Sequence, residues 1–285
     1  IVDDKPTPGI AGMQVYVGEH THWPGEEMSA VLGEIVQDGT HFIFRPSFSF
    51  RPGLTYTAFW EQSSPYVFSI PASGDRPRVV QVFPSDEEVP ANLLKIYLHF
   101  SAPMGEGQAY QQLLLTNATG DTIHQPFVPL QPELWSEDRR RLTLWLDPGR
   151  VKRGLLSHEM HGVVLAPEEA YILTIQSGWK AINGNILGKS YEKKIRVKAP
   201  DYKQPDPAHW SVSAPHAGTT EPLVIHFGEA MDHALAPRLI RVLNDAERAV
   251  AGSVELTSGE RQWHFVPDEA WQRGDYFIVI NTDLE

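Results

Sequence analysis

The sequence predicts an all-β protein made of tandem immunoglobulin-like β-sandwiches, the first of them a candidate for a partial sandwich. Three observations lead to this fold class. Short segments with alternating apolar residues recur along the chain, no window of 12 or more residues keeps a helical apolar period, and one strand block occurs three times. Glycine (22) and proline (23) are plentiful, which fits many short strands joined by tight turns.

The clearest strands are 94–100 and 223–227, in which every second residue is large and apolar. Because side chains alternate across a strand, each segment presents one buried face and one outward face. His99 and His226 fall on the outward face. Further strands are expected at 79–83, 112–116, 141–146, 171–176, 191–197, 261–266 and 275–281.

A repeated block connects the three parts of the chain. Two large apolar residues on one strand face precede a proline at 42–46, 144–148 and 263–267. A strand that carries a tyrosine follows each copy, at Tyr56, Tyr171 and Tyr276. Proline ends a ladder because it has no N–H, so each block predicts a buried strand, a turn and a returning strand.

Two of the repeats share a further element upstream of the block. Phe100 and Phe227 each end an alternating strand, and Met104 and Met231 follow four residues later. Both methionines are expected in the core, because a flexible thioether fills irregular space at a strand end. The first unit lacks this element, which is why a partial sandwich is expected there.

Proline-rich segments divide the chain into three predicted domains, since such segments act as semi-rigid spacers. The domains are an N-terminal β unit at 1–74, an immunoglobulin-like sandwich at 78–199 with an insertion at about 149–166, and an immunoglobulin-like sandwich at 207–285 that ends before its last strand. The insertion is either a functional loop or a solvated surface loop.

Composition narrows the classes of partner. The net charge of −12 disfavours nucleic acid and anionic lipid, because both must be met by clustered lysine and arginine. The chain has no cysteine, which excludes disulfides, thiolate metal sites and a cysteine nucleophile. No apolar run approaches the roughly 20 residues of a membrane helix, so no membrane insertion of this segment is expected.

Residues 82–104 contain a proline, a charged loop with Val89-Pro90, and a strand ending in Phe100-Ser101-Ala102-Pro103-Met104, and residues 215–231 form a looser copy. This pattern resembles the start of the bacterial Ig-like domain of the S-layer SbsA type. Gly105 and Ala181 stand where the family pattern has an acid. The whole chain also resembles a group of exported proteins of planctomycete-type bacteria.

The resemblance implies sandwiches that serve as spacers, surface-layer building blocks or adhesive modules of exported proteins, in the periplasm, cell envelope or outside the cell. It implies no catalytic residue and no cofactor. The expected function is therefore a non-catalytic structural or adhesive module whose partner is a protein or glycan of the cell surface. The alternative is a carbohydrate-binding or enzyme-accessory module.

Histidine pairs are the candidates for a metal site, and both depart from familiar motifs. His158 and His161 are three residues apart, whereas the zincin motif needs two histidines four apart on a helix. His20 and His22 would lie on the same side of a strand, close enough for one divalent ion. No third ligand is identifiable for either pair, so the alternative is a surface loop and an exposed edge strand.

Tryptophans are the candidates for sugar stacking, since an exposed indole offers a flat apolar face. Trp263, Trp271 and Trp145 are assigned to strand faces and corners by the repeat. The remaining candidates are Trp23, Trp60, Trp135, Trp179 and Trp210. Tryptophans also pack the joints between sheets, so each of these positions has a structural alternative.

Overall fold

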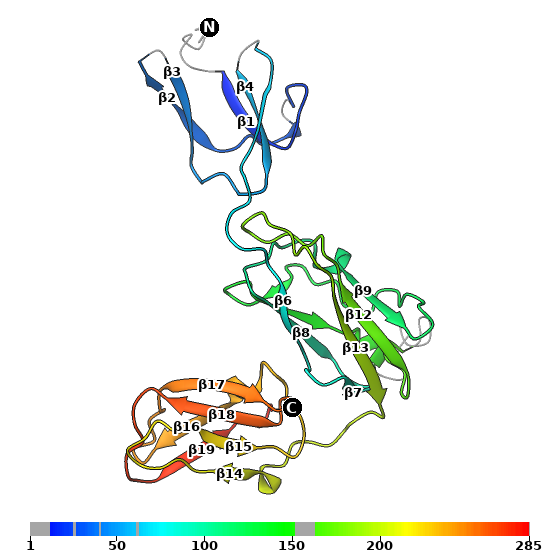
Figure 1. The fold of residues 1–285 in the computed structure, drawn as a ribbon, viewed down its shortest axis with the longest axis vertical. Coiled ribbons are helices and arrows are strands. Elements are labelled where there is room, and N and C mark those ends of the chain that lie inside the picture. The colour runs from blue at the N-terminus through cyan, green and yellow to red at the C-terminus, as the bar shows by residue number, and fades with distance from the viewer. Residues whose placement is uncertain (1–11, 25–26, 40, 61–62, 152–162, 285) are drawn as a thin grey trace, which may run out of the picture. The chain divides into compact units, whose positions relative to one another are not determined.

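The computed structural model describes residues 12–24, 27–39, 41–60, 63–151 and 163–284 (Figure 1). Its strands fall into three sets that share no sheet. The helices among the described residues are single turns: η2 (Ala109–Gln111), α1 (Pro148–Val151), η3 (Pro207–His209) and α3 (Ala236–Leu239). None of these helices is long or apolar enough to cross a membrane.

The first set comprises β1 (Met13–Val17), β2 (Gly33–Asp38), β3 (His41–Pro46), β4 (Thr55–Trp60) and β5 (Tyr66–Ser69). One sheet has the order β1-β4-β5, and β2 and β3 form a separate antiparallel hairpin. On β4, Tyr56 and Phe59 are buried on opposite faces, so apolar residues cover both sides of this sheet. The set is smaller than the other two.

The second set comprises β6 (Val79–Phe83), β7 (Glu88–Pro90), β8 (Lys95–Phe100), β9 (Leu113–Asn117), β10 (Leu134–Trp135), β11 (Arg141–Trp145), β12 (Ala170–Ile175) and β13 (Tyr191–Lys198). Two four-stranded sheets have the orders β10-β11-β8-β6 and β7-β13-β12-β9, with β7 and β13 parallel. Leu98 pairs with Leu142 across β8 and β11, and both are fully buried. The predicted strands of this region are confirmed to within about one residue.

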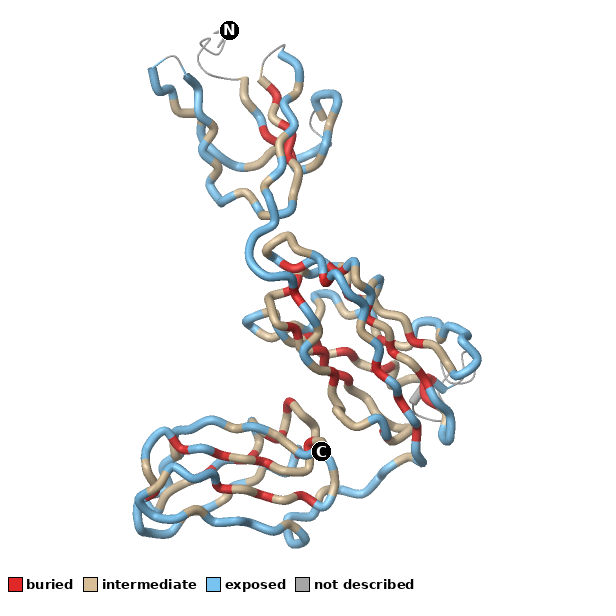
Figure 2. Tube along the Cα trace, viewed as in Figure 1, coloured by how far each residue is buried: buried red, intermediate tan, exposed pale blue. Residues whose placement is uncertain are grey.

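The third set comprises β14 (Ser211–Ser213), β15 (Leu223–His226), β16 (Ile240–Asn244), β17 (Gly252–Thr257), β18 (Gln262–Pro267) and β19 (Tyr276–Ile280). A sheet of order β14-β15-β18-β17 and the pair β16-β19 share one apolar core. Figure 2 shows the buried positions of this set, which alternate with intermediate or exposed ones along β15, β16 and β18. The fold is all-β and consists of tandem immunoglobulin-like sandwiches.

Each of the three repeated tyrosines makes the same kind of hydrogen bond, from an upstream backbone N–H to its hydroxyl. The hydroxyl of Tyr56 accepts the N–H of Arg51 at 2.8 Å, and that of Tyr171 accepts the N–H of Ala166 at 3.0 Å. The hydroxyl of Tyr276 accepts the N–H of Gln272 at 3.1 Å. A tyrosine that bonds back to the backbone just upstream is a tyrosine corner, typical of immunoglobulin-like sandwiches. The sequence repeat is therefore a structural repeat, because the same corner recurs in each set.

The predicted core methionines are buried, with Met104 at 0% and Met231 at 3% exposure. By its internal contacts the chain forms two compact units, residues 1–78 with 102–105 and 177–189, and the remainder. The second and third sets thus fall mainly in one unit. The three-domain division stays a prediction, although every sheet lies within one predicted domain.

Candidate functional site

An aromatic groove in the first set is the candidate binding site. It has a volume of about 330 Å³ and lies among the inward faces of β1, β3, β4 and β5. Its lining residues are Met13, Val15, Phe42, Phe44, Phe50, Ala58, Trp60, Ser63, Ser64, Tyr66 and Phe68. None of them carries a charge, so the groove fits an apolar or aromatic-stacking ligand.

Ring contacts fix the side chains that line the groove. Phe42 of β3 lies against Trp60 of β4, with ring centroids 5.0 Å apart. Phe50 touches Phe44, Tyr56 and Phe68, the last with centroids 5.3 Å apart. These contacts connect the hairpin to the three-stranded sheet. The walls are therefore preformed, although Phe42 is 38% and Tyr66 69% exposed.

Comparison with the third set shows why the groove is open. Gly33 of β2 faces Pro46 of β3, as Gly252 of β17 faces Pro267 of β18. A Cβ on Gly33 would lie 2.6 Å from the ring of Phe44, and one on Gly252 would lie 2.7 Å from the ring of Phe265. In both hairpins a glycine makes room for the phenylalanine of the repeated block. The pair β2-β3 is thus the counterpart of β17-β18.

The third set contains a strand beside β18, namely β15, that has no counterpart among the described residues of the first set. There, β15 pairs with the other edge of β18, with Ile225 opposite Trp263, and buries Leu223 and Ile225 in the core. In the first set, β3 pairs with β2 alone among the described residues. Among the described residues, the groove consequently lies open beside that edge; the partial sandwich expected for this unit stays a prediction.

The predicted histidine pair of the first set makes local hydrogen bonds. His20 and His22 lie in the loop after β1, not on a strand, so the expected alternation of a strand does not hold. The Nε2–H of His20 donates to the carbonyl of Val17 at 2.8 Å, and its backbone N–H donates to the hydroxyl of Thr57. His22 bonds the hydroxyl of Thr21 at 2.9 Å.

The second histidine pair, His158 and His161, lies outside the described residues, as does most of the predicted insertion. Within the described part of the chain, no group of three histidine or acidic side chains is placed to hold a metal ion. The structure therefore brings together no candidate metal ligands there.

The five candidate tryptophans have different surroundings. Trp60 lines the groove, and Trp23 is 42% exposed and packs on Phe59 of the opposite sheet face. Trp179 has 0% exposure, so its prediction as a sugar-stacking residue is wrong. Trp135 and Trp210 are half-buried against Phe100 and Phe227, respectively. Of the five, only Trp60 lies in the groove.

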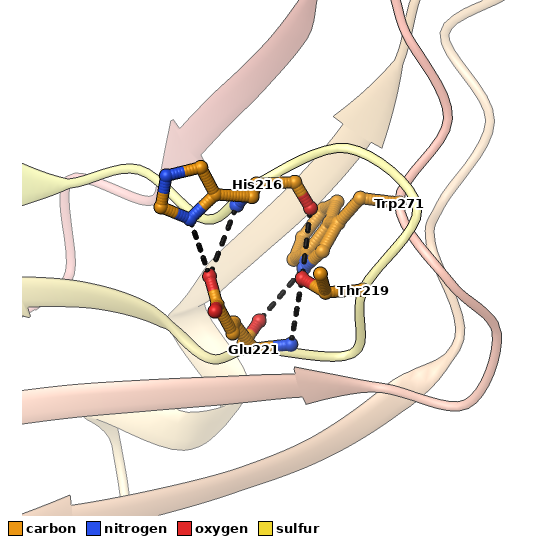
Figure 3. Close-up of polar contacts among 4 residues, drawn as sticks. All are labelled: His216, Thr219, Glu221 and Trp271. Carbon is orange, nitrogen blue, oxygen red and sulfur yellow. Dashed lines mark hydrogen bonds and ion pairs between the residues drawn. The ribbon is translucent and has the colours of Figure 1, made fainter.

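A polar cluster closes the loop before β15 (Figure 3). The Nδ1–H of His216 donates to a carboxylate oxygen of Glu221 at 2.8 Å, and this bond holds the pKa of the Glu221 carboxyl below its usual range. The hydroxyl of Thr219 donates to the carbonyl of His216, and the indole N–H of Trp271 donates to the carbonyl of Glu221. These polar groups are hydrogen-bonded to one another. The cluster is therefore best explained as a structural one that holds the loop against Trp271.

No family model matches the chain, and no curated protein matches its sequence. The solved structures that are similar include the following three. Domains MG0-NIE-MG1 of α2-macroglobulin from Escherichia coli are 16% identical, with 74% of this chain and 67% of that chain covered and a TM-score of 0.29. The four N-terminal Ig domains of Dscam1 isoform 6.44 are 10% identical, with 95% and 66% covered and a TM-score of 0.21.

The third is a structure with xylogluco-oligosaccharide, 11% identical, with 96% of this chain and 56% of that chain covered and a TM-score of 0.24. This chain spans 13% of the whole Escherichia coli α2-macroglobulin. At such identities and TM-scores these likenesses carry no argument about function. The fold class rests on the sheets, the shared core and the tyrosine corners described above.

Proposed function

We propose that this chain is a non-catalytic structural or adhesive module of an exported bacterial protein, of the S-layer Ig-like type. Its location would be the periplasm, the cell envelope or the outside of the cell. The single observation that carries the binding role is the uncharged aromatic groove beside the open edge of β3. The other sets, in this proposal, space and present that groove.

The favoured occupant of the groove is an extended peptide segment from a surface protein. An added strand would bond its backbone to the open edge of β3, which is the common mode of strand addition to a sheet. Every second side chain would point into the groove, where Phe44 and Phe68 offer apolar contact. In the third set, β15 supplies such a strand through Leu223 and Ile225.

A peptide with the sequence of residues 221–228 is therefore the matched probe. We expect it to bind the whole chain, as measured by calorimetry and NMR, and a scrambled peptide of the same composition not to bind. Ala58→Glu places a charge in the groove and should weaken binding at least about tenfold. Trp23→Ala, on the opposite sheet face, is the matched control and should bind normally. Equal binding of the Ala58→Glu variant would overturn the groove as the binding site.

The second candidate function is carbohydrate binding, favoured by the exposed edges of Phe42, Trp60 and Tyr66 in the groove. Aromatic faces stack on the apolar faces of sugars. A glycan array distinguishes peptide binding from carbohydrate binding. If the groove binds a sugar, the wild-type chain should bind at least one glycan on the array. Trp60→Ala should abolish that binding, and Trp23→Ala should leave it unchanged. Absence of any hit, with peptide binding retained, leaves the strand-binding module alone.

A further inference from the structure

The second and third sets meet at a cluster of aromatic rings that contains two histidines. His233 follows β15 and stacks on Phe83 of β6, with ring centroids 3.4 Å apart and planes inclined by 12°. The ring of His99 on β8 lies edge-on to both, 4.9 Å from His233 and 4.9 Å from Phe83. His99 was expected to face solvent, but this contact half-buries it.

Both imidazoles present a buried nitrogen without a hydrogen-bond partner among the described residues, Nδ1 of His233 and Nε2 of His99. An imidazolium carries a proton on each nitrogen, so protonation would bury an unpaired N–H donor. The ring contacts do not require a charge on either imidazole. The cluster therefore favours the neutral form of both histidines.

The groups around the pair act in both directions on an added positive charge: Arg141 opposes it, and two aspartates favour it. The titratable and charged side chains that face it are Lys95 and Tyr97 on β8, Arg141 on β11, Asp138 in the preceding turn, and Asp232 next to His233. Arg141 and the second imidazole disfavour protonation of His233, and Asp232 favours it. Asp138 favours protonation of His99, and Arg141 disfavours it.

The two carboxylates are already engaged by other donors. Asp232 accepts the hydroxyl of Tyr97 at 2.7 and 2.8 Å, lies 3.8 Å from the amine of Lys95, and accepts the N–H groups of Ala234 and Leu235. Asp138 accepts the hydroxyl of Ser136 and the N–H of Arg140. Both oxygens of Asp232 therefore already accept hydrogen bonds, whereas the bonds of Asp138 go to its Oδ1 alone.

We propose that the His99–His233 pair is a pH-sensitive latch between the second and third sets, closed while both imidazoles are neutral and released when they are protonated. The contact of His233 with Phe83 is the closest ring contact in it. A hollow of about 370 Å³ lined by His99, Asp138 and Arg141 gives solvent a route to His99. The latch goes beyond the proposed binding function and does not depend on it.

Burial of the imidazoles determines the direction of the pH effect on latch closure and the pH range in which it occurs. Desolvation lowers the pKa of His233 to about 4 and also lowers the pKa of His99, so the closed joint favours the neutral forms. Release restores a pKa of about 6.5, so closure is fully stable above that pH and is lost as pH falls toward about 4. For His233 alone, the opening equilibrium rises about thirtyfold between pH 7.5 and pH 5.

The polar contacts beside the latch contain no histidine. Glu260, 3% exposed, accepts the N–H of Ser85 at 2.8 Å, and Arg261 pairs with Asp86 at 2.5 Å. The amine of Lys193 donates to the carbonyls of Ser85 and Asp86. A variant at His233 therefore removes the titrating group and leaves this polar half of the joint unchanged.

The test uses the lack of cysteine in the chain. Lys194→Cys on β13 and Ser253→Cys on β17 place one spin label on each set, both at exposed positions, and pulsed electron resonance gives the distance between them. We expect a single narrow distance at pH 7.5 and a broad, shifted population at pH 5. His233→Phe keeps the stacked ring and should stay narrow at both values. His209→Gln, at an exposed position, should respond like the wild type.

A distance that does not change down to pH 4 would overturn the latch, as would an unchanged response in His233→Phe. If that variant does not fold, NMR titration of the wild-type imidazoles still decides. An apparent pKa of His233 between about 4 and 6.5, with the distance changing over the same pH range, supports the latch. Titration near 6.5 with no change in distance contradicts it.

Discussion

Replacement of Tyr171 by phenylalanine tests whether the repeated tyrosine is a corner that stabilises its sandwich. The change removes one hydroxyl and keeps the ring, which is 6% exposed. The lost bond joins the hydroxyl to the N–H of Ala166 at 3.0 Å. A net hydrogen bond contributes about 1 kcal/mol, and a half-buried N–H left without a partner adds up to about 1 kcal/mol more. We therefore expect the free energy of unfolding of the second set to fall by about 1–2 kcal/mol.

Tyr276→Phe is the matched comparison, because its hydroxyl makes the same bond at 3.1 Å at an exposed position where water can replace it. Its expected loss is below about 1 kcal/mol. Urea unfolding followed by pulsed hydrogen exchange reports β12 and β19 separately, which is necessary because a chain of several domains does not unfold in one transition. With a slope of about 2 kcal/mol per molar urea, Tyr171→Phe should lower the β12 midpoint by about 0.5–1 M. An unchanged midpoint, or a larger loss in Tyr276→Phe, would refute the reasoning.

Two further predictions concern the cores. Met104→Ala should lower the free energy of unfolding by about 2–5 kcal/mol, because the side chain is fully buried and its removal leaves a cavity, whereas Met28→Ala, 40% exposed, should change it by less than about 1 kcal/mol. Thermal unfolding checks both, and equal effects would contradict the assignment of Met104 to a core. Gly252→Ala puts a Cβ 2.4 Å from the carbonyl of Val266 and should destabilise the third set by about 1–3 kcal/mol in the same assay. A neutral Gly252→Ala would contradict the close approach of β17 and β18.

The sequence predicts the strands and the repeat because both depend on local patterns. Alternation places Leu142 and Leu144 on the buried face of β11, and both have 0% exposure. Each block proline lies at or just beyond the end of a strand, and a tyrosine corner follows it. Gly33 and Gly252 each pair with a block proline. They are therefore also part of the repeat, although the alternation of apolar residues does not identify them.

Contacts between distant elements could not be predicted in this way. Alternation shows that His99 lies opposite the core face, but whether that face meets water depends on what packs there, and it meets His233 from the third set. Likewise, the sequence does not show whether the side chain of Trp179 lies in the core or faces solvent, and the structure buries it fully. The missing Phe–Met element distinguishes the first unit from the other two, but the groove itself arises from a strand order that no local pattern encodes.

The claim that the groove awaits an added strand is tested most directly by hydrogen exchange at β3. Those β3 amides that do not bond β2 lie on an open edge and should exchange quickly in the chain alone. Addition of the peptide of residues 221–228 should slow them at least about tenfold and leave β17 unchanged. Rates at β3 that stay the same at saturating peptide, or amides already protected without it, would contradict the account.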